Sequence, residues 1–231
     1  MNTIWREPRG TKMPIGPEEI HIWRVPLWTG AICPPSFSSQ ERIRAERFHS
    51  EQPRQRYITS HIALRYILAK YLLTPPAEVI IVQPELKKPY LAGNASDRAI
   101  SFNLSRSEDM CLIAVTESVQ AGVDIECLRP ERYEPGMESL VFTADESAAL
   151  AAIEPEERWR AFLSGWTRKE AYGKCIGLGL SADLAHAELG LTEETIRFQG
   201  ITVASFVPCD RFIAAWAAAD ALTPSFWNWI P

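Results

Sequence analysis

Acidic side chains recur in two short segments that lie about forty residues apart in the chain. The first segment reads G-V-D-I-E, and a strand there would point Asp124 and Glu126 to one face. In the second segment, Trp166, Glu170 and Lys174 follow at intervals of four, which places them on one stripe of a helix. Three carboxylates brought together repel one another unless a cation lies between them. Mg²⁺ takes oxygen ligands, including phosphate oxygens, so the pattern predicts metal-assisted chemistry on a phosphate compound.

Both segments resemble the motifs of the Sfp-type 4′-phosphopantetheinyl transferases, a family with a G-[IV]-D-[IV]-E strand followed by a W-x-x-K-E-A-x-x-K helix. Lys88-Pro89 stands where the family has G-K-P, with Lys87 in place of the glycine. The stretch F-N-L-S-R-S stands where the family has F-N-[IL]-S-H-S, with Arg106 in place of the histidine. The resemblance covers most of the chain. It implies transfer of the 4′-phosphopantetheine arm of coenzyme A to a serine of an acyl or peptidyl carrier protein.

The resemblance also implies roles for single residues. Asp124, Glu126 and Glu170 would be Mg²⁺ ligands, and Lys174 would neutralise the pyrophosphate or assist proton transfer. Without the resemblance, the first two acids read as an exposed strand face, and Glu170 as a helix-surface partner of Lys174. The expected catalytic residues are Glu146, Glu170 and Lys174. The residues expected to bind coenzyme A are Arg56, Lys88, Ser105 and Arg106.

Glu146 allows two interpretations. The stretch T-A-D-E before an apolar run has the form of a capping box, in which Thr143 and Glu146 satisfy each other's backbone N–H groups. The same stretch resembles the family segment whose glutamate is proposed as general base or accessory metal ligand. The sequence alone does not decide between these roles.

Several arginines of the first half also have alternatives. Arg106 could bind a coenzyme A phosphate bidentately at any pH, unlike the histidine that it replaces. It could instead form a surface ion pair with Glu108 or Asp109. Three further arginines read as a solvated helix face or a docking surface for an acidic partner: Arg42, Arg44 and Arg47.

Two long helices are predicted to position these groups. The first begins near Ser50 and ends at a T-P-P stretch from Thr74, and the second runs from about Pro155 to a capping Gly177. Short strands around each helix predict an α+β fold in which two similar α/β halves form a pseudo-twofold pair with the active site at their interface. The expected strands are Val79–Gln83, Ala99–Asn103, Cys111–Thr116, Val119–Glu126, Thr195–Phe198, Thr202–Val207 and Arg211–Ala217.

Charge is distributed unequally between the two expected halves, 1–116 and 117–231. The net charge is −5, yet residues 1–115 carry 15 Lys and Arg against 11 Asp and Glu, and the remainder 9 against 18. A phosphate-rich ligand suits such a join, with coenzyme A phosphates on the first half and the metal-binding acids on the second. The overall acidity argues against nucleic-acid binding. The first ~20 residues, rich in Pro and Gly, are expected to form a loose arm, and the aromatic tail to dock on the core.

Composition indicates an ordinary globular protein, with 46% hydrophobic and 23% charged residues. No stretch approaches the ~18 apolar residues of a membrane span, and the N-terminus lacks the apolar region of a secretory signal. The five cysteines form no C-x-x-C pair, which argues against a disulfide framework and a structural zinc site. We therefore expect a cytoplasmic, monomeric enzyme that uses Mg²⁺, without membrane or nucleic-acid partners.

Two other classes of function remain possible at this point. A metal-dependent nuclease or phosphohydrolase also places acids on a strand beside a Glu/Lys helix, but such sites usually carry an acid and a lysine two apart on one strand. A catalytically lapsed module could bind coenzyme A or a carrier protein without transfer. The intact acidic triad argues against the lapsed module, and the replacement at Arg106 argues mildly for it.

Overall fold

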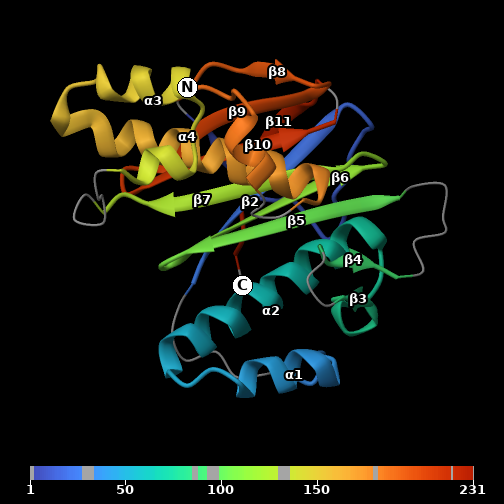
Figure 1. Ribbon diagram of the computed structural model, residues 1–231. Helices are drawn as coiled ribbons and strands as arrows, with labels where there is room; N and C mark the ends of the chain where they lie inside the picture. Colours follow the sequence, from blue (N-terminus) through green and yellow to red (C-terminus); the bar gives the residue numbers. More distant parts are fainter. Residues whose placement is uncertain are drawn as a thin grey trace.

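The structure, a computed structural model, has a mixed α+β architecture in which two β-sheets pack face to face and a long helix covers the outer face of each (Figure 1). It describes residues 3–27, 34–84, 88–92, 99–129, 136–178, 182–219 and 221–230. Lys87, which replaces the glycine of the G-K-P turn, lies outside the described residues.

The first sheet draws its strands from both ends of the chain. In spatial order they are β1 (Trp5–Arg6), β11 (Thr223–Asn228), β2 (Glu19–Pro26), β6 (Met110–Glu117) and β5 (Ile100–Ser107). The pairs that β11 makes with β1 and β2 are parallel, and the other pairs are antiparallel. The expectation of a loose N-terminal arm is therefore wrong for β1 and for the start of β2. The central strand β2 buries side chains on both faces, so it lacks the alternation that marks a half-buried strand.

The second sheet is entirely antiparallel. Its strands lie in the order β7 (Ala121–Cys127), β10 (Phe212–Ala218), β9 (Ile201–Cys209) and β8 (Ile196–Phe198). A separate two-stranded ribbon pairs β3 (Ile81–Val82) with β4 (Tyr90–Leu91). Each strand expected from the sequence has a counterpart, whereas β1, β2, β4 and β11 had not been foreseen as strands.

The helices agree with the sequence-based boundaries. Helix α2 (Glu51–Leu72) ends at Leu73, which adopts a left-handed conformation with φ of 54° before the prolines. Helix α4 (Pro155–Ile176) ends at Gly177, whose φ of 78° favours glycine. The remaining helical elements are α1 (Ser39–Glu46), α3 (Ala144–Ala151) and the 3₁₀ segments η1 (Pro76–Glu78), η3 (Met137–Leu140) and η4 (Ala182–His186).

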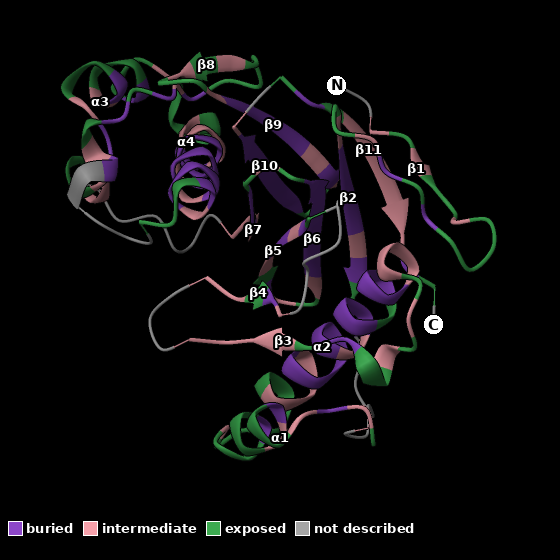
Figure 2. Cartoon of the chain, turned by 90° about the vertical axis from the view of Figure 1, so that its right-hand side faces the viewer, coloured by how far each residue is buried: buried purple, intermediate pink, exposed green. Residues whose placement is uncertain are grey.

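The apolar layers follow the alternation of side chains along the strands. In β2, Ile20 and Ile22 face the second sheet, and Trp23 and Val25 face α2. Buried residues accordingly run through both sheets and along the sheet-facing sides of α2 and α4 (Figure 2). The aromatic tail docks as expected, since the Trp227 ring stacks on Trp23 with centroids 6.0 Å apart. In the part of the chain that the structure describes, no helix is long and apolar enough to cross a membrane.

The turn between β6 and β7 falls where the two halves were expected to divide. Ser118 has a φ of 62° there, and the chain passes directly from the first sheet into the second. The division into 1–116 and 117–231 and the pseudo-twofold relation between the halves stay predictions. Strand β11, from the C-terminal part, completes the first sheet.

Candidate active site between the two sheets

The edges of the two sheets meet along β5 and β7. Strand β5 is an outer strand of the five-stranded sheet, and β7 is an outer strand of the four-stranded sheet (Figure 1). Side chains of β5 accept hydrogen bonds from the β7 backbone: Asn103 Oδ1 from the Val123 N–H at 2.9 Å, and Ser107 Oγ from the Cys127 N–H at 3.0 Å. The F-N-L-S-R-S and G-V-D-I-E motifs are therefore neighbours in space.

Asp124 lies at the centre of this contact and is 3% exposed. Its Oδ1 accepts a hydrogen bond from Ser105 Oγ at 2.7 Å and lies 2.5 Å from Lys174 Nζ. The other oxygen, Oδ2, is buried and has no hydrogen-bond partner among the described residues. On the same face of β7, Glu126 Oε2 accepts from Ser107 Oγ at 2.9 Å. Because a buried carboxylate oxygen normally finds a donor, the free Oδ2 indicates a position for an external ligand.

A glycine allows α4 to approach these acids. A Cβ atom on Gly122 would lie 2.0 Å from the Ala171 carbonyl oxygen and 2.6 Å from the Cys175 nitrogen, both of them helix backbone atoms that cannot move aside. Only glycine fits between β7 and α4 at this point. The resulting close packing places Glu170 and Lys174 beside Asp124, which explains the glycine at the start of G-V-D-I-E.

Three carboxylates gather where β7 and α4 meet. Burial, together with the charges of Asp124 and Glu126, raises the pKa of Glu170 to about 7, although the Lys174 ammonium acts in the opposite direction. The predicted ligands Asp124, Glu126 and Glu170 are thus electrostatic neighbours. No group of three or more His, Cys, Asp or Glu side chains among the described residues is arranged to hold a metal ion. The available ligand atoms are nevertheless carboxylate oxygens, one of them buried without a partner among the described residues. Such oxygens are the ligands that a hard divalent cation prefers.

Glu146 has very different surroundings. The capping box is confirmed, since Glu146 Oε2 accepts from the Thr143 N–H at 3.0 Å and Thr143 Oγ1 accepts from the Glu146 N–H at 3.1 Å. Its Oε1 accepts from the Leu189 and Gly190 N–H groups at 2.8 and 2.9 Å. Lys169 Nζ lies 2.7 Å from Oε2, and both side chains are buried. Both carboxylate oxygens are therefore bonded within the protein; the general-base alternative stays a prediction.

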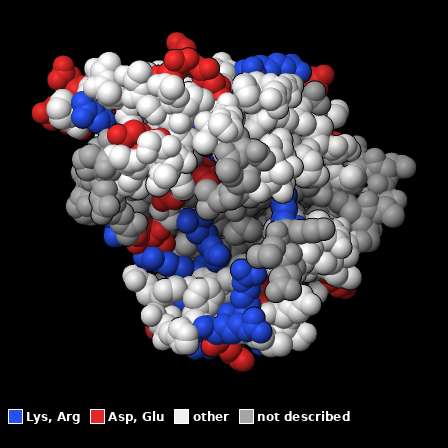
Figure 3. Space-filling model, in the orientation of Figure 1, with Lys and Arg blue, Asp and Glu red and all other residues white. Residues whose placement is uncertain are grey.

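Basic side chains lie at the end of β5. Glu108 Oε2 pairs with Arg56 at 3.0 Å and with Arg129 at 2.9 Å. Arg106 donates to Ser60 Oγ at 3.1 Å, and its guanidinium lies over the Tyr57 ring at 5.5 Å. Figure 3 shows Lys and Arg side chains gathered in the hollowed middle and lower part of this face. Exposed positive charge next to an acid cluster is the arrangement expected for a phosphate ligand bridged by a cation.

A pocket of about 780 Å³ opens beside this basic group. Among the residues that line it are Arg44 of α1 and Arg47, which follows α1 directly, together with Tyr57 and His61 of α2. The sequence predicts a solvated helix face or a docking surface for these two arginines, whereas the structure has them on a pocket wall. Their spacing of three residues on a short helix was the only available indication.

Lys88 lies apart from the arginines and contacts the start of β7. Its Nζ donates to Gln120 Oε1 at 3.0 Å and to the Ala121 carbonyl oxygen at 2.6 Å. Burial lowers the pKa of the Lys88 ammonium to about 8. The lysine of the G-K-P turn thus reaches the strand that carries the acids.

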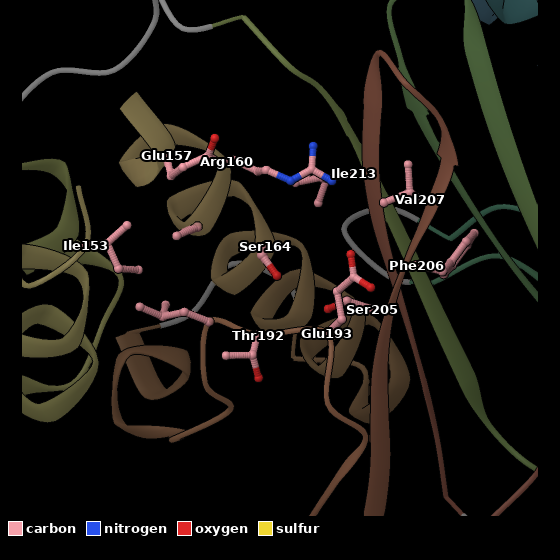
Figure 4. A pocket seen from close by; sticks show the side chains of 12 residues that line it. Ile153, Glu157, Arg160, Ser164, Thr192, Glu193, Ser205, Phe206, Val207 and Ile213 are labelled. Carbon is pink, nitrogen blue, oxygen red and sulfur yellow. The ribbon is translucent and has the colours of Figure 1, made fainter. Parts of the chain in front are cut away.

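A second cavity, of about 230 Å³, lies between α4 and the strands β9 and β10 (Figure 4). Figure 4 shows Arg160 and Ser164 on the helix side and Ser205 and Phe206 on the strand side. None of the predicted site residues lines this cavity. It is therefore separate from the acid cluster.

Comparison with known proteins bears on what this arrangement is. Residues 120–220 match the 4′-phosphopantetheinyl transferase superfamily, and residues 31–118 match the family described as 4′-phosphopantetheinyl transferase, N-terminal. The 4′-phosphopantetheinyl transferase HetI of Nostoc sp. is 32% identical over 231 residues, which cover 96% of this chain and 97% of that protein. The chain belongs to the 4′-phosphopantetheinyl transferase superfamily.

Two more members of this superfamily resemble the chain over shorter stretches. A putative 4′-phosphopantetheinyl transferase of Synechocystis sp. is 32% identical over 64% of this chain and 59% of that protein. A phosphopantetheinyl transferase of Thraustochytrium sp. is 29% identical over 78% of this chain and 68% of that protein. The two superfamily matches adjoin at the β6–β7 turn, and the acid cluster lies where β5 of one meets β7 of the other.

Proposed function

We propose that this superfamily member transfers the 4′-phosphopantetheine arm of coenzyme A to a serine of an acyl or peptidyl carrier protein. In this reaction the serine oxygen attacks the β-phosphorus, the bond to the α-phosphate oxygen breaks, and adenosine 3′,5′-bisphosphate leaves. The observation that carries the proposal is the acid cluster beside Lys174, where the carboxylates of Asp124, Glu126 and Glu170 interact electrostatically and Asp124 Oδ2 has no partner among the described residues.

A divalent cation, Mg²⁺ by preference, would be held by Asp124, Glu126 and Glu170. When bound, it would neutralise pyrophosphate charge as the leaving group departs. The residues themselves would do the positioning. Ser105 fixes the Asp124 carboxylate through a 2.7 Å hydrogen bond, and Lys174 supplies a positive charge at the same oxygen. Lys174 is thereby placed to interact with phosphate oxygens as well.

The serine hydroxyl of the carrier must lose its proton during the attack. Lys174, whose Nζ lies 2.5 Å from Asp124 Oδ1, would assist this proton transfer beside the proposed cation site. Glu146 is the alternative base, although its contacts with Lys169 and three backbone N–H groups support the capping role.

The phosphates of coenzyme A would lie on the basic side of the join. The proposed contacts are Arg56, Lys88, Ser105 and Arg106, with Arg44 and Arg47 on the wall of the adjoining pocket. Guanidinium groups bind phosphate through paired hydrogen bonds, which supports Arg106 in the place of an imidazole.

Mass spectrometry of a carrier protein provides the test. An apo carrier incubated with the enzyme, coenzyme A and Mg²⁺ should gain one phosphopantetheine group, and adenosine 3′,5′-bisphosphate should appear in equal amount. Cleavage of coenzyme A without modification of the carrier would instead identify a phosphohydrolase. Coenzyme A binding without either product would identify a lapsed binding module.

A further inference from the structure

Polar side chains recur at every second position of β5 on the side that meets β7. Asn103, Ser105 and Ser107 all bond to β7, and each bond reaches a different point along that strand. Asn103 and Ser107 are 5% and 8% exposed. Side chains two apart on a strand share a face, so one strand face supplies the whole contact.

Asn103 and Ser107 supply hydrogen-bond acceptors to the outer edge of β7. Strand β7 pairs with β10 on one side only, which leaves backbone N–H groups on its other side without a strand partner. Val123 and Cys127, four residues apart, point their N–H groups to that free side and donate to Asn103 Oδ1 and Ser107 Oγ. Side-chain acceptors thus replace a main-chain ladder and hold the two sheet edges in register.

Ser107 makes a second bond that reaches the acid cluster. A backbone N–H can only donate, so the Ser107 oxygen accepts from Cys127, and its single proton is free to go to Glu126 Oε2, 2.9 Å away. The β7 backbone therefore fixes the direction of the hydroxyl, and the hydroxyl fixes the carboxylate. Ser105 likewise donates to Asp124 Oδ1, but Lys174 Nζ donates to the same oxygen, so Asp124 does not depend on the serine alone.

We propose that Ser107 is a positioning residue that holds the Glu126 carboxylate for divalent-cation binding by tying it to the β7 backbone. The inference rests on the proposed metal ligands. Partners that orient a metal ligand commonly contribute tenfold or more to metal affinity, although they do not touch the metal. Ser107 lies outside the set of residues assigned above to the metal or to coenzyme A.

The test measures cation binding directly, by electron paramagnetic resonance of Mn²⁺ added to the full-length protein. Ser107→Ala should weaken Mn²⁺ binding about tenfold. It should also raise the Mg²⁺ concentration needed for half-maximal transfer by a similar factor, with kcat at saturating Mg²⁺ close to wild type. Ser101→Ala makes the same chemical change on the same strand, at a residue without a hydrogen bond to β7 in the described structure, and should leave both values unchanged.

A volume-matched pair separates the hydroxyl from packing, in case the alanine variant does not fold. Ser107→Thr retains the hydroxyl and should bind Mn²⁺ like wild type, whereas Ser107→Val has nearly the same shape and should bind about tenfold more weakly. Equal Mn²⁺ affinity in the threonine and valine variants would overturn the positioning role of Ser107 and leave the proposed function unaffected. A wild-type protein that transfers phosphopantetheine but binds no Mn²⁺ would overturn the metal site. Mn²⁺ binding with the expected pattern but without transfer would overturn the proposed function and leave the positioning role standing.

Discussion

Helix α4 carries two adjacent charged residues with opposite surroundings. Lys169 is buried against Glu146, whose two oxygens also accept three backbone hydrogen bonds. The next residue, Glu170, lies near Asp124 and Glu126, and the Lys174 ammonium is beside them. The first group is balanced within the protein, whereas in the second the charges of Asp124 and Glu126 raise the pKa of Glu170.

This difference distinguishes Glu146, an acid with a structural role, from Asp124, Glu126 and Glu170, the proposed ligands of a cation. A buried ion pair with complete hydrogen bonding tolerates no loss of a partner, because the remaining charge stays in a medium of low polarity. Carboxylates that repel one another reduce stability by themselves and gain from an external cation. Mutations in the first group should therefore affect folding, and mutations in the second should affect activity.

The largest effect is expected for Asp124→Ala. This change removes a proposed cation ligand and should reduce phosphopantetheine transfer at least a thousandfold, or about 4 kcal/mol of barrier. Carrier modification by mass spectrometry measures the rate, and excess Mg²⁺ should restore it only in part. Since the change also relieves repulsion with Glu170, the thermal midpoint should not fall by more than a few degrees. Near-normal turnover of Asp124→Ala would contradict the division into a structural group around Glu146 and a functional group around Asp124.

Lys169→Met should act mainly on stability. It leaves the buried Glu146 carboxylate without its ammonium partner and should lower the free energy of unfolding by about 3–5 kcal/mol. Urea denaturation measures this loss. The double variant Lys169→Met with Glu146→Gln removes both charges and should recover much of it.

Glu170→Gln is the matched control for this comparison. It should leave the free energy of unfolding of the cation-free protein unchanged or raised, because it removes a repelled charge. A folded Glu146→Gln protein with a tenfold or greater loss of rate would, in contrast, favour Glu146 as the general base.

Glu41 extends the comparison to pH. This buried acid sits in the capping box of α1 and pairs with Arg65 at 2.6 Å. Burial alone would raise its pKa, but hydrogen bonds from His61, Arg65 and the Ser38 backbone lower the pKa to about 2. A lowered folded-state pKa gives stability that is present above the unfolded value near 4.5 and lost as pH falls towards 2.

Urea denaturation at pH 6 and pH 3 should reveal this contribution. Wild type should lose about 2 kcal/mol more than Glu41→Gln over this interval, since the variant lacks the titrating group. Identical pH slopes for the two proteins would mean that Glu41 is not held by its partners as described.

Arg106→Ala should have the smallest of these effects. The guanidinium donates to the neutral Ser60 hydroxyl, so it retains capacity for a phosphate. Its removal should raise the KM for coenzyme A about tenfold, in line with a hydrogen bond to a charged group. Dephospho-coenzyme A, without the 3′-phosphate, should show a much smaller change.

Two further variants check the Arg106 prediction. Arg106→His should recover part of the affinity and lose it above pH ~6.5, where imidazole is neutral. Arg211→Ala removes an exposed arginine that pairs with Asp109 and should leave both KM values unchanged. Equal losses on both substrates for Arg106→Ala would contradict a 3′-phosphate contact.

Local patterns predicted the elements that carry the site. The strand around Asp124, the helix around Glu170 and the capping box at Glu146 all depend on residues close in sequence, and the structure has each of them. The reason for Gly122 could not be read locally, because it is the approach of α4 from some fifty residues away.

Pairings between distant segments were the part that the sequence could not provide. Lys169 and Lys174 stand in one motif, yet only the folded chain shows their partners, Glu146 for the first and Asp124 for the second. The bond of Ser107 to Glu126 depends on the register of two sheet edges, which no periodicity encodes. Strand β2 was missed because burial on both faces removes the alternating pattern.

The position of β11 has a consequence for how the protein is made. This strand inserts between β1 and β2, where Arg24 donates two hydrogen bonds to Asn228 Oδ1 across some two hundred residues of chain. During translation, the sheet that contains β5 therefore lacks an internal strand until residue 228 has left the ribosome. In a nascent chain β2 can already pair with β6, but β1 has no strand partner until β11 has been made, so the first sheet is completed only after the segments that carry Asp124 and Glu170.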